Sequence, residues 1–152
     1  MNLEIVFSTA NMAASLGWIL LIVWYAGGHR WSILDAAVRQ YWWPLALAVV
    51  YTIAITATMT GILPSSDGGF GSIKGVRTLF ESDGALLAGW VHYLAFDLFV
   101  GIGVGQSAKQ RGISIWLMLP VWFFVFMFGP VGYVLWRLIR IRAGKAGDGV
   151  QL

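Results

Sequence analysis

The chain has 152 residues, of which 59% are hydrophobic and only 11% are charged. A soluble domain carries roughly 25% charged residues, so this chain has too little polar surface to cover a water-facing globule. Cysteine is absent, which excludes disulfides, thiolate metal sites and cysteine nucleophiles. The basic residues stand singly or in pairs between apolar runs, as in membrane proteins, and form no cluster suited to nucleic acid.

Four stretches of low charge follow one another along the chain, and each is long enough to cross a membrane, which takes about 20 mostly apolar residues. The third of them holds His92 and Asp97 as its ionisable residues. The sequence therefore predicts an all-α membrane protein, a single domain of 1–152 built as a four-helix transmembrane bundle. The expected spans are 5–26, 41–63, 84–108 and 113–136, followed by a basic, flexible tail at 137–152.

A Gly-rich loop, Pro64–Asp83, separates the second expected span from the third. The spacing of Ile73, Val76 and Leu79 is helical, which predicts a short helix on the membrane interface within this loop. Acidic residues at its end suit the positive end of the next helix, where Asp83 is a candidate cap.

An even number of spans puts both termini on the same side of the membrane. With four spans, six basic residues accompany the termini and four lie on the opposite side. The excess favours cytoplasmic termini. No cleavable signal peptide is expected, because the N-terminus lacks a basic segment before its long apolar run.

Polar side chains within lipid are expected to face the interior of the bundle, and each span has a candidate inward stripe. The Gly101–Gly105 pair is of the kind that lets helices approach closely. Pro120 and the Gly129–Pro130 pair are expected to bend the fourth helix. The simpler interpretation of the hydroxyl stripes is helix packing or bonding to the helix backbone. The candidate stripe is Ser8, Asn11 and Ser15 in the first span, Thr52, Thr56 and Thr60 in the second, and Gly89, Tyr93, Asp97, Gly101 and Gly105 in the third.

Asp97 is the leading functional candidate, because an acid deep in a span costs a few kcal/mol when charged and usually has a function. His92 lies five residues earlier, about 140° around a helix, so the two do not share a face. We interpret both as catalytic candidates; the alternatives are a structural carboxyl for Asp97 and an interfacial anchor for His92. The candidates for binding substrate are Trp90, Tyr93, Asn11, Thr56 and Asp83.

Asp83, Trp90 and Asp97 are seven residues apart, which keeps them close to one helical stripe. Such a line fits an elongated apolar ligand with a polar end group. With two histidines and no cysteine, neither a metal centre nor a cofactor is expected.

The stretch GWVHYLAFDLFVG at Gly89–Gly101, followed by FMFGPVGYVLWRLIR at Phe126–Arg140, resembles the abscisic-acid-deficient-four-like family of small membrane proteins. The segment GVRTLF at Gly75–Phe80 is also similar, and the resemblance extends from about residue 60 to 140. It implies a role in xanthophyll metabolism, since plant members are required to make neoxanthin from violaxanthin. The short chain looks like a bacterial-type member, which implies a multi-pass protein of a bacterial inner membrane.

Neoxanthin formation is an isomerisation, in which an epoxide opens to an alcohol while a vinylic proton leaves to give an allene. The leading hypothesis is therefore a carotenoid isomerase in which Asp97 and His92 act as acid and base, or the reverse. One alternative is a non-catalytic pigment-binding or assembly subunit of a larger membrane complex, and another is a small-molecule or proton carrier. The expected partners are membrane lipid, a carotenoid or related polyisoprenoid, and further copies or subunits of a pigment–protein complex, without nucleic acid.

Overall fold

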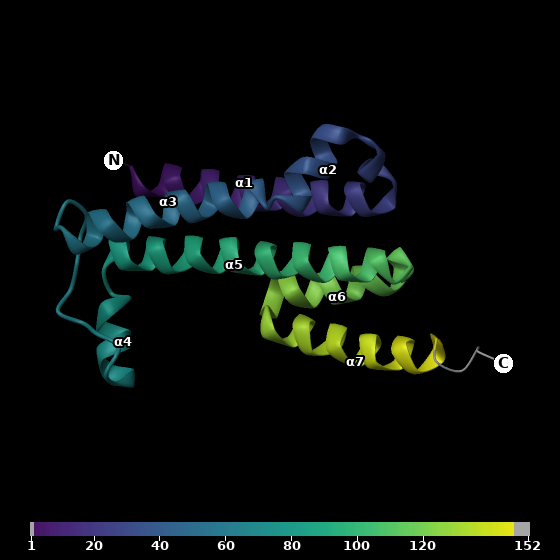
Figure 1. Ribbon diagram of the computed structural model, residues 1–152. Coiled ribbons are helices and arrows are strands. Elements are labelled where there is room, and N and C mark those ends of the chain that lie inside the picture. Colours follow the sequence, from purple (N-terminus) through teal and green to yellow (C-terminus); the bar gives the residue numbers. More distant parts are fainter. Residues whose placement is uncertain (1, 148–152) are drawn as a thin grey trace. The chain divides into compact units, whose positions relative to one another are not determined.

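The computed structural model describes residues 2–147, with the backbone alone at 143–147, and every regular element in this range is helical. Three helices are long and apolar enough to cross a membrane (Figure 1). They are α1 (Leu3–Ala26), α3 (Trp42–Met59) and α5 (Asp83–Gln110). These helices confirm an all-helical chain with apolar segments near the first three expected spans.

The fourth expected span, 113–136, is divided in two. The apolar helix α6 (Ile115–Phe128) has 14 residues and ends at Gly129, whose φ of 32° and ψ of −83° interrupt the helix. A second helix, α7 (Pro130–Gly147), begins directly afterwards. The sequence indicated a bend at Gly129–Pro130, and the structure shows a complete reversal. A transmembrane bundle of four helices is therefore not confirmed.

Helix α7 also continues through much of the segment that the sequence analysis assigned to a flexible tail. Residues 137–147 are part of this helix, and residues 148–152 lie outside the described range. The remaining elements are short. They are η1 (Gly28–Arg30), α2 (Ser32–Arg39) and α4 (Ile73–Leu79).

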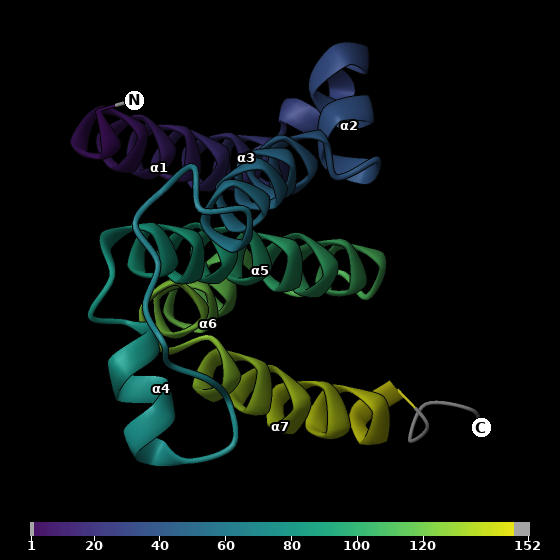
Figure 2. The same ribbon diagram turned by 90° about the vertical axis from the view of Figure 1, so that its left-hand side faces the viewer.

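The short helix α4 lies within the expected Gly-rich loop and runs across the direction of α5 (Figure 2). It begins at Ser72, whose hydroxyl accepts a 3.0 Å hydrogen bond from the backbone N–H of Gly75. Helix α5 is capped similarly by Ser82, which accepts from the N–H of Ala85 at 3.3 Å. A place for α4 at the membrane interface stays a prediction, as does the single domain.

The described residues fall into two compact units, and α1 and α5 contribute to both of them. Unit 1 takes residues up to 17 and 42–95, which include α3, α4 and the first part of α5. Unit 2 takes residues 18–41 and those from 96 onward, which include η1, α2, the rest of α5, α6 and α7.

In unit 1 the first part of α1 packs beside α3, where the indole N–H of Trp43 donates a 2.8 Å hydrogen bond to the carbonyl of Ala13. The buried face of α1 in this unit consists of Ala10, Ala14 and Gly17. Small side chains let two helices approach closely, which matters in lipid because apolar burial alone gives neighbouring helices little attraction. The expected stripe of Ser8 and Ser15 is instead exposed.

The threonine stripe of the second expected span was also expected inside, and this prediction was wrong. Thr52, Thr56 and Thr60 are exposed. The hydroxyls of Thr52 and Thr60 donate to carbonyls one turn earlier, at 2.8 and 2.9 Å, so they need no partner across a helix interface. Thr58, which lies outside the stripe, is the buried threonine.

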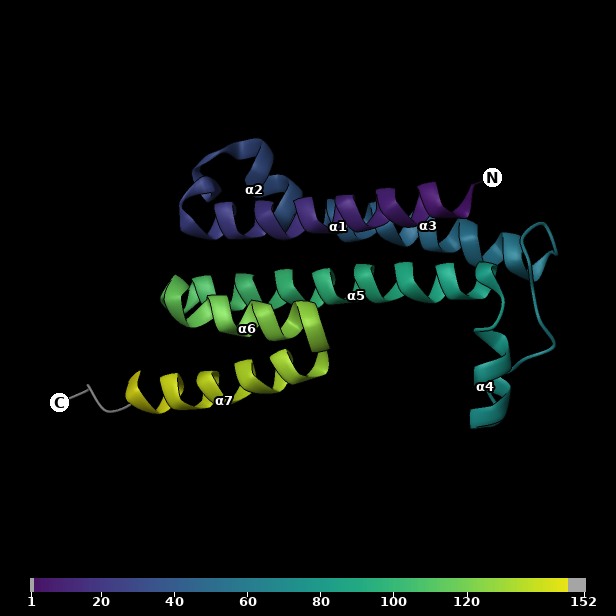
Figure 3. The same ribbon diagram turned by 180° about the vertical axis from the view of Figure 1, so that it is seen from behind.

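In unit 2 helix α6 lies along the second part of α5, and α7 runs back along α6 (Figures 1 and 3). The turn from α5 into α6 uses Gly112, which has a φ of 64°. Around it the N–H groups of Gly112 and Ile113 bond to the carbonyls of Lys109 and Ala108, a common way of ending a helix. The largest fully buried side chains in this unit are Trp24, Leu21, Leu98, Met118, Val121 and Val125.

Candidate functional site

A cavity of about 550 Å³ in unit 1 is the first part of the candidate site. Its walls come from α3, from the segment between α3 and α5, and from the start of α5, and they combine apolar side chains with hydroxyls and one imidazole. The lining residues are Tyr51, Ile55, Thr58, Met59, Ser65, Ser66, Phe70, Leu79, Phe80, Ala85, Gly89 and His92. A mostly apolar cavity with a few convergent polar groups is the usual form of a small-molecule site.

His92 brings the imidazole to this cavity from α5. Its ring centroid lies 5.1 Å from that of Tyr51 on α3, at an interplanar angle of 61°. Edge-to-face packing of this kind holds two rings in a defined relative orientation. His92 was predicted from the sequence but Tyr51 was not, because nothing in the spacing within α3 indicated which of its residues faces α5.

Two hydroxyls of the cavity are fixed by hydrogen bonds to the backbone. Thr58 donates to the carbonyl of Ala54 at 2.9 Å, and Ser66 donates to the carbonyl of Leu79 at 3.3 Å. The Ser66 bond ties the loop after α3 to the end of α4. Phe80 packs on α5 at Gly89, where a Cβ would lie 2.5 Å from its ring. The segment between α3 and α5, which forms this wall, is therefore held near its start by Ser66 and near its end by Phe80.

Three of the five expected substrate-binding residues come together elsewhere in unit 1. The indole N–H of Trp90 donates to Asn11 Oδ1 at 3.1 Å, and Asn11 Nδ2 donates to the carbonyl of Phe7 at 2.8 Å. The ring centroid of Trp90 lies 5.7 Å from the ring centroids of both Phe7 and Tyr93. Asn11 thus connects α1 to α5, and these residues do not line the cavity.

The other two expected substrate-binding residues stand apart from this cluster. Thr56 is exposed on α3, and Asp83 is the exposed first residue of α5. Neither of them lines the cavity. A role for these five residues in substrate binding stays a prediction.

Asp97 is the second part of the candidate site and belongs to unit 2. It is only 8% exposed, and its Oδ2 atom is buried. The carboxylate packs against Gly129 at the break between α6 and α7, where a Cβ would lie 2.5 Å from Asp97 Oδ1. Glycine at position 129 thus serves both the backbone reversal and the fit of the carboxylate.

The face of α5 that carries Asp97 continues through Gly101 and Gly105, which the sequence analysis expected to allow close helix contacts. Indole rings fill the space that these glycines leave: a Cβ at Gly101 would overlap the ring of Trp18, and one at Gly105 would lie 3.0 Å from Trp122. The indole N–H of Trp122 donates a buried 3.0 Å hydrogen bond to the carbonyl of Gly101. Asp97 therefore lies on a tightly packed protein face.

His92 and Asp97 lie on the same helix but in different units, so the structure describes two separate environments for them. His92 lines a cavity of unit 1, whereas Asp97 is buried in unit 2 beside the α6–α7 turn. The catalytic assignment of both residues stays a prediction.

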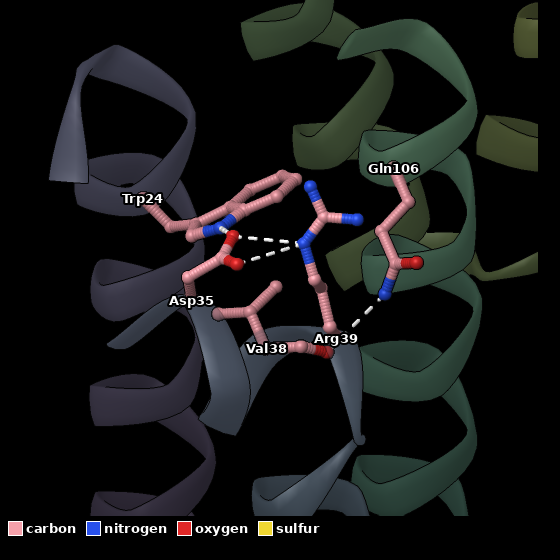
Figure 4. Close-up of polar contacts among 5 residues, drawn as sticks. All are labelled: Trp24, Asp35, Val38, Arg39 and Gln106. Atoms are coloured by element: carbon pink, nitrogen blue, oxygen red, sulfur yellow. Dashed lines mark hydrogen bonds and ion pairs between the residues drawn. The ribbon is translucent and has the colours of Figure 1, made fainter. Parts of the chain in front are cut away.

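Unit 2 also contains a polar cluster that the sequence analysis missed (Figure 4). The carboxylate of Asp35 accepts from the indole N–H of Trp24 at 2.8 Å and from Arg39 Nε at 2.9 Å. The Trp24 bond, followed by the Arg39 bond, holds the pKa of the Asp35 carboxyl below its ordinary value. Gln106 of α5 donates to the carbonyl of Val38 at 3.2 Å. The i, i+4 spacing of Asp35 and Arg39 was the signal available in the sequence.

The family model described as ABA DEFICIENT 4-like matches residues 5–136, which include the cavity, Asp97 and the α6–α7 turn. No curated protein and no solved structure matches the chain. The match covers most of the sequence and agrees with the resemblance carried by the third-span and FGP motifs. The chain therefore belongs to the ABA DEFICIENT 4-like family.

Proposed function

We propose that the protein acts on a carotenoid or a related polyisoprenoid within the membrane, in xanthophyll-related metabolism. Family membership implies this metabolic role. The observation that carries the proposal further is the cavity of unit 1, which presents His92 together with hydroxyls among apolar walls. Such a lining suits the oxygenated ring at the end of an apolar polyene, because the ring needs both apolar contact and a few hydrogen bonds.

The proposed reaction is the isomerisation of a carotenoid epoxide. An acid donates a proton to the epoxide oxygen, the C–O bond breaks, and a hydroxyl forms. A base removes the vinylic proton, whose C–H electrons complete the allene, so no atom or electron is gained or lost. Imidazole is the most frequent general acid or base in enzymes, and carboxyl groups serve the same purpose. The proposal assigns one proton transfer to His92, which lines the cavity. For the other transfer it keeps Asp97, a candidate that rests on the sequence and not on the cavity lining.

A pigment assay in cells that accumulate an epoxy-xanthophyll tests this proposal. The chain is expressed there, membrane insertion is verified by immunoblot, and pigments are separated by chromatography. We expect an allenic product with the parent chain and a loss of at least 100-fold with His92→Gln or Asp97→Asn, from the usual contribution of an acid or base. His29→Gln and Asp67→Asn are matched controls, because these residues lie outside α5 and do not line the cavity. Controls that lose product equally would count against the assignment.

A second function, a non-catalytic pigment-binding or assembly subunit, is favoured by a separate observation in unit 2. A series of phenylalanines on α5 and α6 is exposed: Phe96, Phe99, Phe123, Phe126 and Phe128. Large exposed apolar side chains can meet a polyene or another membrane protein as well as lipid. Purifying the protein from the same cells tests this function. Unchanged pigment that remains bound to the purified protein, with no allenic product in the cells, supports it and removes support for the isomerase.

A further inference from the structure

The turn between α6 and α7 lies beside the middle of α5. Gly129 packs against Asp97, and Asp97 stands 14 residues after the first residue of α5 and 13 residues before the last, Gln110. At 1.5 Å per residue, about 20 Å of helix separates Asp97 from the end of α5. Helix α6 is about 21 Å long by the same measure, which is less than the roughly 30 Å of hydrocarbon that a span must cross.

Helix α7 turns back toward the end from which α6 came. A Cβ at Gly132 would overlap the backbone nitrogen of Val125, so the two helices touch within one turn of Gly129. From there α7 follows α6 in the opposite direction, toward the C-terminal end of α5 (Figures 1 and 3). Arg137, the first basic residue of α7, lies about 12 Å beyond the turn, and Arg142 lies about 20 Å beyond it.

These lengths place the basic part of α7 at the depth where α5 ends. The end of α5 carries Lys109, and Arg111 follows it. Within unit 2 the same end meets the end of α1, because Lys109 Nζ donates a 2.7 Å hydrogen bond to the carbonyl of Tyr25. It also meets α2, through the bond from Gln106 to Val38 (Figure 4).

The basic residues of the chain divide unevenly once α6 and α7 are counted as a hairpin. With four complete spans the division was six to four. With three spans and a hairpin, Lys74 and Arg77 lie on the side of the N-terminus, and the other eight of the ten basic residues lie on the opposite side. Those eight are Arg30, Arg39, Lys109, Arg111, Arg137, Arg140, Arg142 and Lys145.

We propose that α6 and α7 form a re-entrant hairpin that enters and leaves the membrane on one side, and that this side faces the anionic headgroups of the cytoplasmic leaflet. An excess of Lys and Arg near span ends sets cytoplasmic orientation, and eight against two is a far larger excess than six against four. Basic residues next to the end of a span are attracted to an anionic leaflet. Arg30, Arg111, Arg137 and Arg140 are exposed and can meet headgroups directly.

This arrangement places the N-terminus outside and the C-terminus in the cytoplasm, which revises the expectation that both termini are cytoplasmic. The reversal of the backbone at Gly129 then lies at mid-depth. Irregular backbone is tolerated at that depth only where protein covers it. Gly129 is buried, and the Asp97 carboxylate packs on it.

Cysteine labelling tests the hairpin directly, because the chain has no cysteine of its own. Asn2→Cys, Ser65→Cys, Ser32→Cys and Gln151→Cys are each treated with a membrane-impermeant maleimide in spheroplasts and in inverted vesicles. We expect residues 2 and 65 to react in spheroplasts, and residues 32 and 151 to react in inverted vesicles. No pigment is measured, so the outcome is independent of the proposed reaction.

Two results would overturn the proposal in different parts. If residue 151 is labelled from the same side as residue 2, α6 and α7 together cross the membrane and the hairpin is wrong. If residues 32 and 151 share a side but react in spheroplasts, the hairpin holds and the cytoplasmic orientation is wrong. The triple variant Arg137→Gln/Arg140→Gln/Arg142→Gln tests whether basic residues set the orientation. It should convert part of the population to the inverted labelling pattern, and an unchanged pattern contradicts a role for these charges.

Discussion

Replacing Gly129 by alanine puts a methyl group where the Asp97 carboxylate lies. The added Cβ would be 2.5 Å from Oδ1 and 3.4 Å from Cγ of Asp97, so the carboxylate must move. Position 129 also has a φ of 32°, which side-chain-bearing residues rarely adopt. Backbone strain of this kind costs about 1–3 kcal/mol, and overpacking costs about 1–3 kcal/mol. We expect Gly129→Ala to lower the free energy of unfolding by about 3 kcal/mol.

Unfolding in mixed micelles, followed by tryptophan fluorescence as the denaturing detergent is increased, measures this loss. Two other glycines separate its causes. Gly61 has a φ of 74° and nothing within 4 Å of an added Cβ, so Gly61→Ala reports strain alone, and Gly71→Ala reports neither effect. We expect about 1 kcal/mol for Gly61→Ala and almost no change for Gly71→Ala.

The double variant Asp97→Ala/Gly129→Ala identifies the carboxylate as the obstacle. Removing it leaves room for the new methyl group, so the two substitutions should be less harmful together than the sum of their separate effects, by about 1–2 kcal/mol. The reasoning would be refuted if Gly129→Ala cost no more than Gly61→Ala. Additive effects in the double variant would likewise show that Asp97 and Gly129 do not meet.

Two further predictions concern unit 2. Trp122→Phe removes the buried hydrogen bond to a carbonyl of α5 and should lower the free energy of unfolding by about 1 kcal/mol. The control Trp116→Phe, at a residue that is 77% exposed, should change it little. Equal losses in the two variants would contradict a stabilising role for the Trp122 hydrogen bond. The second prediction concerns Asp35, whose pKa is lower in the folded chain than in the unfolded chain. Its ionised carboxylate therefore stabilises the fold fully above the unfolded-state pKa of about 4. This contribution is lost as the pH falls through the lower folded-state pKa. The free energy of unfolding of the parent chain should therefore fall more on acidification below pH 4 than that of the Asp35→Asn variant. Parallel curves of this free energy against pH would exclude the role.

The three long helices could be predicted because hydrocarbon imposes a simple rule on sequence. A span needs about 20 residues with almost no charge, and charges therefore mark where spans end. The expected limits 5–26 and 84–108 lie within one or two residues of α1 and α5. The same rule failed at 113–136, since low charge does not distinguish one crossing helix from two apolar segments that fold back on each other.

The faces of the helices were harder to predict than their positions. Polar residues were expected to point inward, yet Thr52 and Ser8 are exposed while Ala10 and Ala14 are buried. A hydroxyl in a helix satisfies itself on the preceding turn, so its polarity does not force it toward a neighbour. Asp97 followed the rule, because a carboxyl group has no such local solution.

The candidate site was predicted in part. His92 and Asp97 were selected for their ionisable side chains, but residues such as Tyr51 and Ser66 join the cavity through contacts between segments that are distant in sequence. Gly129 was recognised as a bend. Its fit against Asp97 depends on which face of α5 meets the turn, and that information is not contained in either segment alone.

One wall of the cavity is supplied by the stretch from Ser65 to Phe80, which connects two long helices and is not itself a span. Connecting segments tolerate substitution and insertion far better than the elements that they join. Within this family, mutation can therefore remodel the shape of this cavity without disturbing the long apolar helices on either side of the stretch. Divergence among relatives in the ligands they accept should be concentrated in this stretch.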